Sequence, residues 1–237
     1  MKQELIDKYN VSVPRYTSYP PANFFRTFTE EEYLQDVELS NKARNNNLSF
    51  YFHMPYCRRL CHYCGCNSYP MQKEAQVREY VDALHKEIDL VVAHLDRNRR
   101  ISQIHYGGGS PTAMPVSALK ELNEHLLSLF DTIAKPEIAI ECHPGYLTKE
   151  DWQGLVEARF NRFSIGVQDF NLEVLKLVNR TPSELPMEDI MQILRSSGAS
   201  INMDFLFGLP LQTADSFQHT IEKAAELHPD RVTTFSY

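Results

Sequence analysis

The stretch "YFHMPYCRRLCHYCGCNSYP", residues 51–70, holds four of the chain's five cysteines within ten positions. The spacing is CxxxCxxCxC, and the cysteines are Cys57, Cys61, Cys64 and Cys66. Structural zinc sites usually draw two ligands from each of two separate knuckles, so four thiols in one short loop suit a single tetrahedral ion poorly. A cubane iron–sulfur cluster is larger and takes thiolates from around a loop. If three cysteines hold three irons, the fourth iron keeps an open coordination position.

Around this loop, apolar strand-like runs alternate with segments of helical periodicity. The pattern predicts strands at 48–53, 101–106, 136–141, 162–167 and 201–207. It predicts helices at 73–95, 117–130, 149–158, 172–197 and 214–227. Because parallel strands need crossover connections, five such units in a row indicate an α/β fold with a parallel sheet. Both an open doubly wound sheet and a barrel-like sheet fit this pattern.

Two further segments set the expected domain boundaries. Residues 231–237 resemble a sixth strand with no helix after it, so we expect an incomplete sequence whose core barrel spans 48–237 and whose C-terminal domain is absent. Residues 1–47 form an N-terminal segment. Within it, "VPRYTSYPPANFF" (13–25) is proline-rich and predicts extended chain, followed by a helix at 30–41. We expect this segment to cover the active site, and a loosely packed tail is the alternative.

Composition narrows the class of protein. The chain has 237 residues, 43% of them hydrophobic and 23% charged, which is typical of a globular protein. It has no apolar run of roughly 18 residues and no apolar signal region at its N-terminus, so we expect a cytoplasmic location. In that reducing compartment a cysteine cluster indicates metal or redox chemistry. The net charge of -7 argues against a general nucleic-acid binder, and an anionic substrate would need local arginines.

Polar and glycine residues mark the carboxyl ends of the other predicted strands, where parallel α/β folds bind ligands. "HYGGGSPT" (105–112) follows the second strand, and its glycines allow backbone to approach a ligand closely. The third spaced glycine of a dinucleotide-binding GxGxxG motif is missing. Glu141, Gln168 and Asp204 lie at later strand ends, with Arg180 in a nearby loop. One such residue is more often a helix cap or a satisfied core group, but four at one end indicate a site.

Cys57, Cys61 and Cys64, with the aromatic Tyr63 before the third cysteine, resemble the CxxxCxxC motif of the radical S-adenosylmethionine (SAM) enzymes. The resemblance implies an incomplete (β/α)6 radical SAM barrel with parallel strands. It also implies a 4Fe-4S cluster on these three cysteines, whose unique iron chelates the amino and carboxylate groups of SAM. Reduction of the cluster then cleaves SAM to methionine and a 5'-deoxyadenosyl radical, so the cofactors carry the hard chemistry.

Further motifs resemble one branch of that family, the oxygen-independent coproporphyrinogen III oxidases. They are "KYNVSVPRYTSYP", "GGGSPT", "GVQDF", "VNR" and "NMDFLFGLP". The "PRYTSYP" head and Cys66 are absent from the related heme chaperones. The resemblance implies two SAM molecules in one site, and Cys66 as a possible accessory in catalysis that does not bind the cluster. The implied contacts are Tyr51, Gly108 and Glu141 for the first SAM, and Tyr63, Gly109, Ser110, Gln168, Arg180 and Asp204 for the second.

The implied activity is oxidative decarboxylation of coproporphyrinogen III propionates to vinyl groups, giving protoporphyrinogen IX in anaerobic heme biosynthesis. The resemblance implies an oxidoreductase with an electron donor and acceptor that the sequence does not identify, and we expect a monomer with no nucleic-acid or membrane partner. The substrate carries four carboxylates, and Arg15 is our candidate for pairing with one of them.

One motif departs from the family. Where the family typically has Glu-x-Asp-Pro, the chain reads "ECHPG" (141–145), which places His143 in the acidic position. We assign no role to Cys142 or His143. The departure keeps an alternative open, namely a heme chaperone or a heme-modifying radical SAM paralogue, and a structural zinc protein is the third hypothesis.

Overall fold

A computed structural model describes residues 2–9 and 21–237, with the side chains of Tyr9 and Ala22 left out. Arg15 and most of the predicted extended segment therefore lie outside the described residues. The main sheet has six strands, all parallel. They are β1 (Leu48–Met54), β4 (Ile101–Gly108), β5 (Thr132–Cys142), β6 (Arg162–Gln168), β7 (Ser200–Phe207) and β8 (Arg231–Ser236).

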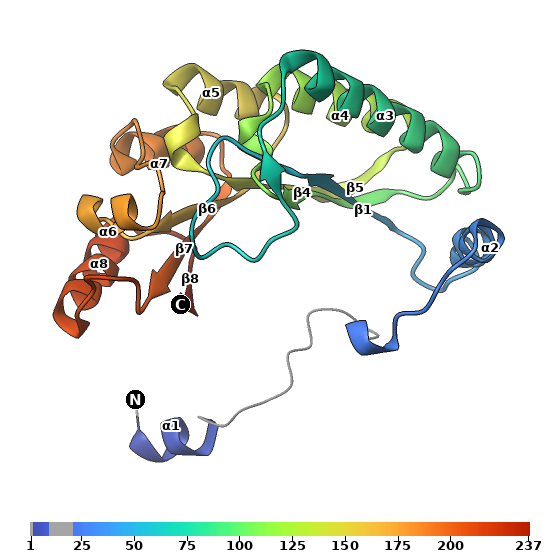
Figure 1. Cartoon of the computed structure of the whole chain (residues 1–237). Coiled ribbons are helices and arrows are strands. Elements are labelled where there is room, and N and C mark those ends of the chain that lie inside the picture. The colour runs from blue at the N-terminus through green and yellow to red at the C-terminus, as the bar shows by residue number, and fades with distance from the viewer. Residues whose placement is uncertain (1, 10–20) are drawn as a thin grey trace.

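The strands follow one another across the sheet in chain order, β1-β4-β5-β6-β7-β8. A doubly wound sheet would reverse its strand order at a switch point, so this order excludes that alternative. The sheet is curved, and β1 and β8 form its two edges without closing on each other (Figure 1). The prediction of an incomplete parallel barrel is confirmed. Only β5 differs clearly from its predicted bounds, because it begins four residues earlier, at Thr132.

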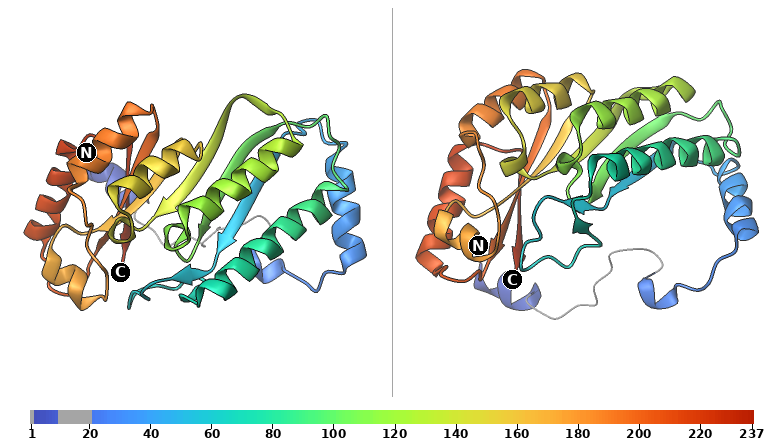
Figure 2. Two further views of the ribbon diagram at one scale, coloured as in Figure 1. Left: turned by 90° about the horizontal axis from the view of Figure 1, so that it is seen from above. Right: turned by 45° about the horizontal axis from the view of Figure 1, so that its top comes forward.

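Helices cover the outer, convex face of the sheet (Figures 1 and 2). They are α3 (Glu74–Val92), α4 (Val116–Leu129), α5 (Lys149–Glu157), α6 (Leu172–Leu177), α7 (Met187–Ser196) and α8 (Ala214–Glu226). Each predicted helical segment contains one of these, and the segment 172–197 contains two. In α3, Val77, Val81, Leu84 and Ile88 repeat every three or four residues and are buried, as an amphipathic helix on a sheet requires.

Period-two alternation in the strands separates core from site. In β6, Phe163, Ile165 and Val167 are buried. The residues between them, beginning with Arg162 and Ser164, are only partly buried. Successive side chains of a strand point to opposite faces, so the apolar set packs under the helices. The polar set consequently lies on the concave face, which none of the helices α3 to α8 covers (Figure 1).

Polar side chains on the concave face are linked from strand to strand. Gln103 of β4 accepts a hydrogen bond from Ser49 of β1 (2.9 Å) and donates one to Glu137 of β5 (2.7 Å). Arg162 of β6 also donates to Glu137, at 2.6 Å. The concave face is therefore lined with polar groups that have partners, as partly buried polar groups require.

The N-terminal section contains α1 (Gln3–Tyr9), a 3-10 turn (Ala22–Phe24) and α2 (Glu30–Ser40). Helix α2 confirms the predicted helix and begins at a capping box formed by Thr29 and Glu32. Its C-terminal end is fastened to the loop after α3, because Asn41 donates to the His94 carbonyl (2.9 Å). That residues 1–47 cover the active site stays a prediction. Among the described residues, no helix has the length and apolarity needed to cross a membrane.

Candidate active site

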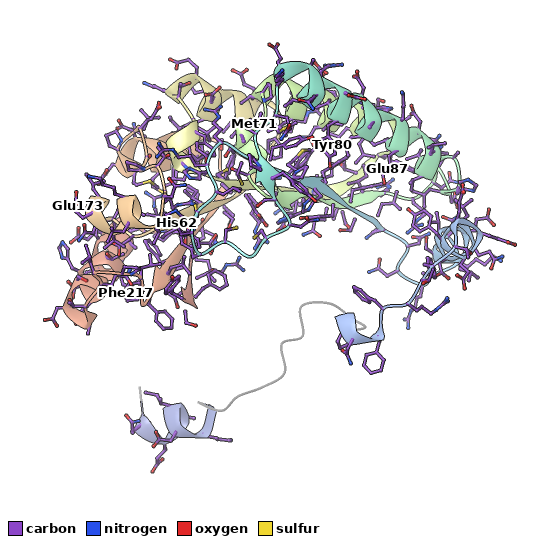
Figure 3. The ribbon with its side chains drawn as sticks, viewed as in Figure 1. His62, Met71, Tyr80, Glu87, Glu173 and Phe217 are labelled. Atoms are coloured by element: carbon purple, nitrogen blue, oxygen red, sulfur yellow. The ribbon has the colours of Figure 1, made fainter. Side chains whose placement is uncertain are left out.

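The cysteine loop, residues 55–73, crosses the carboxyl end of the sheet between β1 and α3. Its two ends are joined by the short parallel strands β2 (Tyr56–Cys57) and β3 (Tyr69–Pro70). Its middle is held from the other side, where His62 contacts the Leu177 carbonyl at 3.1 Å and Asn179 donates to the Leu60 carbonyl at 2.9 Å. Figure 3 shows His62 close to α6, on the far side of the loop from Tyr80 of α3. The loop is thus anchored at both sides by contacts within the protein.

A cavity of about 480 Å³ lies between this loop and the strand ends. All the residues that the sequence predicts for the cluster and for SAM line it, with the exception of Tyr51. They are Cys57, Cys61, Tyr63, Cys64, Gly108, Gly109, Ser110, Glu141, Gln168, Arg180 and Asp204, and Cys66 lines it as well. One cavity therefore brings together residues from the loop and from five strands of the sheet, β4 to β8.

The loop thiols are close enough to affect one another's ionisation. Burial raises the pKa of the Cys57 thiol, the charge of Cys64 raises it further, and a hydrogen bond with Ser68 opposes both. The pKa of Cys66 is raised to about 11, first by burial and then by Cys64. Among the described residues, no three His, Cys, Asp or Glu side chains converge as ligands of a single metal ion would.

Arg180 is the buried cation of the site. One of its terminal nitrogens lies 3.5 Å from the Cys61 sulfur and 3.3 Å from the Tyr63 hydroxyl, and the other donates to the Gly166 carbonyl. Burial raises the pKa of Tyr63 well above its usual range, and Arg180 opposes that shift. The guanidinium thus joins the cysteine loop to strand β6.

The glycine triplet lies where β4 passes beneath the cysteine loop. Gly108 has φ +114°, and a Cβ there would come within 2.7 Å of the His53 ring. A Cβ on Gly109 would come within 3.0 Å of the Pro55 backbone. Only glycine tolerates both the positive φ and the close contact at Gly108. The triplet lets the loop rest directly on the sheet, which keeps its cysteines close to the strand ends.

Asp204 and Gln168 close the other side of the cavity. Asp204 accepts hydrogen bonds from Ser164 and Asn202, both at 2.7 Å. Gln168 follows a register shift in β6 and has φ +70°. That left-handed conformation is uncommon outside glycine and is concentrated at functional sites. Both side chains are thus fixed by the local backbone or by hydrogen-bonded partners.

The model of the radical SAM superfamily matches residues 51–224 of this chain. The chain belongs to the radical SAM superfamily. Membership implies a 4Fe-4S cluster and SAM as its cofactors.

Two curated relatives of the chain bear the name oxygen-independent coproporphyrinogen III oxidase. The chain is 41% identical to the oxygen-independent coproporphyrinogen III oxidase of Escherichia coli, with 98% of this chain and 50% of that protein aligned. It is 36% identical to the enzyme of that name from Synechocystis, with 99% and 50% aligned. The chain therefore spans about half the length of the curated relatives it matches.

Solved structures share the fold of this chain. The structure of coproporphyrinogen III oxidase (HemN) from Escherichia coli, described as a radical SAM enzyme, superimposes with a TM-score of 0.86 at 38% identity. That match covers 100% of this chain and 52% of HemN. The radical SAM methyltransferase TsrM from Kitasatospora setae matches at TM-score 0.53 and 16% identity, covering 81% of this chain and 36% of TsrM, and so shares the fold.

Tyr51 is the predicted SAM residue that the structure places outside the cavity lining. It is 58% exposed and stacks on His105 with ring centroids 5.8 Å apart. His105 in turn contacts Glu141 at 3.1 Å, and the Tyr51 hydroxyl lies 3.2 Å from His53 Nδ1. Tyr51 is thus linked to the cavity of this radical SAM chain by stacking on His105, which lines it.

The sequence analysis missed several residues that line the cavity. These are Arg59, Leu60, His105, Ala139, Ile140, Cys142, His143, Arg162, Ser164, Gly166, Arg231, Thr233 and Phe235. Strand alternation could have found part of this set, because Ser164 lies four residues before Gln168, and His105 lies two residues after Gln103, on the concave face. The loop residue Arg59 carries no periodic signal.

Cys142 and His143, the residues of the unusual ECHPG motif, are both buried. Burial raises the pKa of Cys142 well above its usual range. For His143, burial and then Arg180 lower the pKa to about 2, so the ring is neutral. Its Nδ1 accepts the Gly145 N–H at 3.2 Å, and its backbone N–H donates to Thr112 Oγ1 at 2.9 Å. The position therefore holds a fixed, neutral ring.

The donor set of this cavity fits a thiolate-ligated cluster. Cys57, Cys61 and Cys64 face the cavity from one loop, which matches the thiolate ligation of iron–sulfur clusters. Glu141 and Asp204, with Ser110 between the loop and β4, present polar atoms to the same cavity.

Proposed function

We propose that this chain carries the radical-generating core of an oxygen-independent coproporphyrinogen III oxidase. The observation that carries the proposal is the single cavity that joins the three CxxxCxxC thiols, Cys66 and the polar strand ends. Relatives at 36% and 41% identity bear that enzyme's name and support the substrate. The reaction is oxidative decarboxylation of coproporphyrinogen III propionates to vinyl groups, giving protoporphyrinogen IX.

In this proposal Cys57, Cys61 and Cys64 bind three irons of a 4Fe-4S cluster and leave the fourth open to SAM. The cluster and SAM together supply the 5'-deoxyadenosyl radical that takes a hydrogen atom from a propionate. Cys66 lines the same cavity and stays outside the ligand set as an accessory thiol.

The SAM contacts divide between the two sides of the cavity. For the first SAM molecule we propose Glu141 as an acceptor, the backbone at Gly108 as a close contact and Tyr51 as a residue that reaches it beside His105. For a second molecule we propose Tyr63, Gly109, Ser110, Gln168, Arg180 and Asp204. Arg180 suits a carboxylate, because its guanidinium is held beside Cys61 and Tyr63 and can donate to anions in two directions.

We propose the cytoplasm as the compartment, because free thiols persist there and a cluster can be assembled. The reaction also requires an electron donor and an electron acceptor. The N-terminal segment 1–47 is proposed to close the cavity on the substrate side. The four carboxylates of the substrate need cations, and Arg59 and Arg231 are exposed on the cavity lining.

Anaerobic reconstitution tests the proposal. The chain is loaded with iron and sulfide, reduced with dithionite and supplied with SAM and coproporphyrinogen III. We expect 5'-deoxyadenosine and protoporphyrinogen IX, and neither from the Cys61→Ser variant. Cleavage of SAM without vinyl product would contradict decarboxylation by this chain. Tight heme binding without SAM cleavage would indicate a carrier instead.

A further inference from the structure

The ring of His143 is held by two contacts. It stacks face to face on Tyr146, with ring centroids 3.8 Å apart and planes 6° apart. The Gly145 N–H donates to Nδ1, so Nδ1 is the acceptor nitrogen of this neutral ring. In a neutral imidazole the proton must then lie on Nε2. His143 is thus a rigid donor whose single N–H points away from its own turn.

That N–H has no partner. Among the residues that the structure describes, only His143 Nε2 and Trp152 Nε1 are buried side-chain polar atoms without a hydrogen bond. An unpaired buried donor destabilises a fold, so such a group calls for an explanation. His143 is only 6% exposed and lines the candidate cavity, whereas Trp152 is fully buried in α5 and does not. The missing partner of His143 therefore belongs to what the cavity binds.

The surroundings of His143 select an anionic partner on the cysteine side. Arg180 and Arg58 both act on the ring as positive charges. Arg180 contacts the Cys61 sulfur, while Tyr146, the stacking partner of His143, accepts the Arg59 N–H at 2.9 Å. The charges of Cys57 and Cys61 also reach Tyr146. An electron-rich acceptor bound among these thiols is the group that best matches this donor.

We propose that His143 Nε2–H donates a hydrogen bond to a sulfur atom of the cluster held by Cys57, Cys61 and Cys64. Hydrogen bonds to cluster sulfurs stabilise the more negative, reduced state and raise the reduction potential. His143 is then a positioning and tuning residue that makes the cluster easier to reduce. This inference rests on the proposed function only for the cluster and is independent of the porphyrin substrate.

Two substitutions separate the acceptor role of Nδ1 from the donor role of Nε2. In His143→Asn the short side chain keeps an acceptor near Nδ1 and loses the distant donor, whereas His143→Gln keeps a donor near Nε2. We expect His143→Asn to lower the midpoint potential of the SAM-free cluster by about 59 mV, which corresponds to a tenfold change for one electron. His143→Gln should stay near wild type. Potentials are measured by anaerobic dye-mediated titration followed by electron paramagnetic resonance.

Trp152→Phe is the matched control, because it removes the other unpaired buried N–H far from the cavity lining. It should leave the potential unchanged. An unchanged potential in His143→Asn would overturn the inference. A variant that keeps its potential but binds SAM more weakly would also overturn it, since the acceptor would then belong to SAM.

A measurement on the wild-type chain covers the case in which His143→Asn fails to fold. Protein labelled with 15N-histidine is reduced and studied by pulsed electron paramagnetic resonance. We expect a 15N coupling to the cluster that disappears in His143→Gln, which still folds around a donor without the imidazole. Absence of this coupling in the wild type would overturn the inference. Failure to form vinyl product would not affect either measurement, whereas failure to assemble a cluster would contradict both proposals.

Discussion

The two faces of one sheet have opposite compositions. On the convex face, Phe163 and Ile165 of β6 are fully buried under the helices. On the concave face of the same strand, Arg162 and Ser164 donate hydrogen bonds to side chains on neighbouring strands. Adjacent residues of the strand therefore have different roles, because successive side chains point to opposite faces of the sheet. Stability is concentrated on the helix side of the sheet and chemistry on the open side, and substitutions can test that division.

The largest expected effect is on the concave side, at the cysteine loop. Cys57→Ser should abolish the brown iron–sulfur chromophore after anaerobic reconstitution, because a hydroxyl replaces one of three thiolate ligands. Cys66→Ser should retain it, since Cys66 is the fourth thiol of the same loop and is not a proposed ligand. Visible absorption and iron content measure both. Loss of the cluster in Cys66→Ser would show that the three-plus-one assignment is wrong.

A substitution on the convex side should act on stability instead. Phe163→Ala removes a fully buried ring from the core and should lower the free energy of unfolding by about 3–5 kcal/mol. The neighbouring Ser164→Ala removes the hydrogen bond that Ser164 donates to Asp204 and the one it accepts from Asn202, and should cost about 1–2 kcal/mol. Urea unfolding of the two variants measures the difference. Equal losses of unfolding free energy in the two variants would show that stability is not concentrated on the convex face.

Most of the fold was predictable, because it rests on local periodicity. The spacing of Val77, Val81, Leu84 and Ile88 predicts α3, and every strand of the main sheet matches an apolar run. The helix α1 was missed, because its residues carry no strong apolar stripe. The pairing of β2 with β3 was also missed, because two-residue strands leave no periodic signal.

The site was predictable only for residues that belong to a sequence motif or lie at a predicted strand end. Cysteine spacing predicts which residues share a loop, and strand ends predict that Glu141, Gln168 and Asp204 meet. The stacking of Tyr51 on His105 joins residues 54 positions apart, and the burial of His143 depends on Tyr146 and Thr112 together. Such contacts arise from three-dimensional packing, so no local sequence pattern predicts them.

Along the concave face itself, Glu141 and Glu137 allow a finer comparison. Both are on β5 and four residues apart, but Glu141 lines the cavity, while Glu137 is paired with Arg162. Glu141→Gln should weaken SAM binding about tenfold, because it removes the charge of an acceptor. Glu137→Gln should leave SAM affinity unchanged. Isothermal titration of the cluster-loaded protein measures both, and equal effects would mean that the whole face, not its carboxyl end, binds SAM.

The smallest expected effect is a pH dependence at Glu137. Burial alone would raise the pKa of its carboxyl, but hydrogen bonds from Arg162 and Gln103 outweigh burial and hold that pKa below its usual value. Stability gained from a lowered pKa is fully present above the unfolded value, about 4.3 for glutamate, and is lost as pH falls through the folded value. The urea midpoint of the cluster-free protein should therefore drop below about pH 4, and less steeply in Glu137→Gln than in the wild type. Because the pair is partly solvated, the difference should be small. If the urea midpoint falls with pH equally in both proteins, the hydrogen bonds of Glu137 to Gln103 and Arg162 position side chains on the concave face without stabilising the fold.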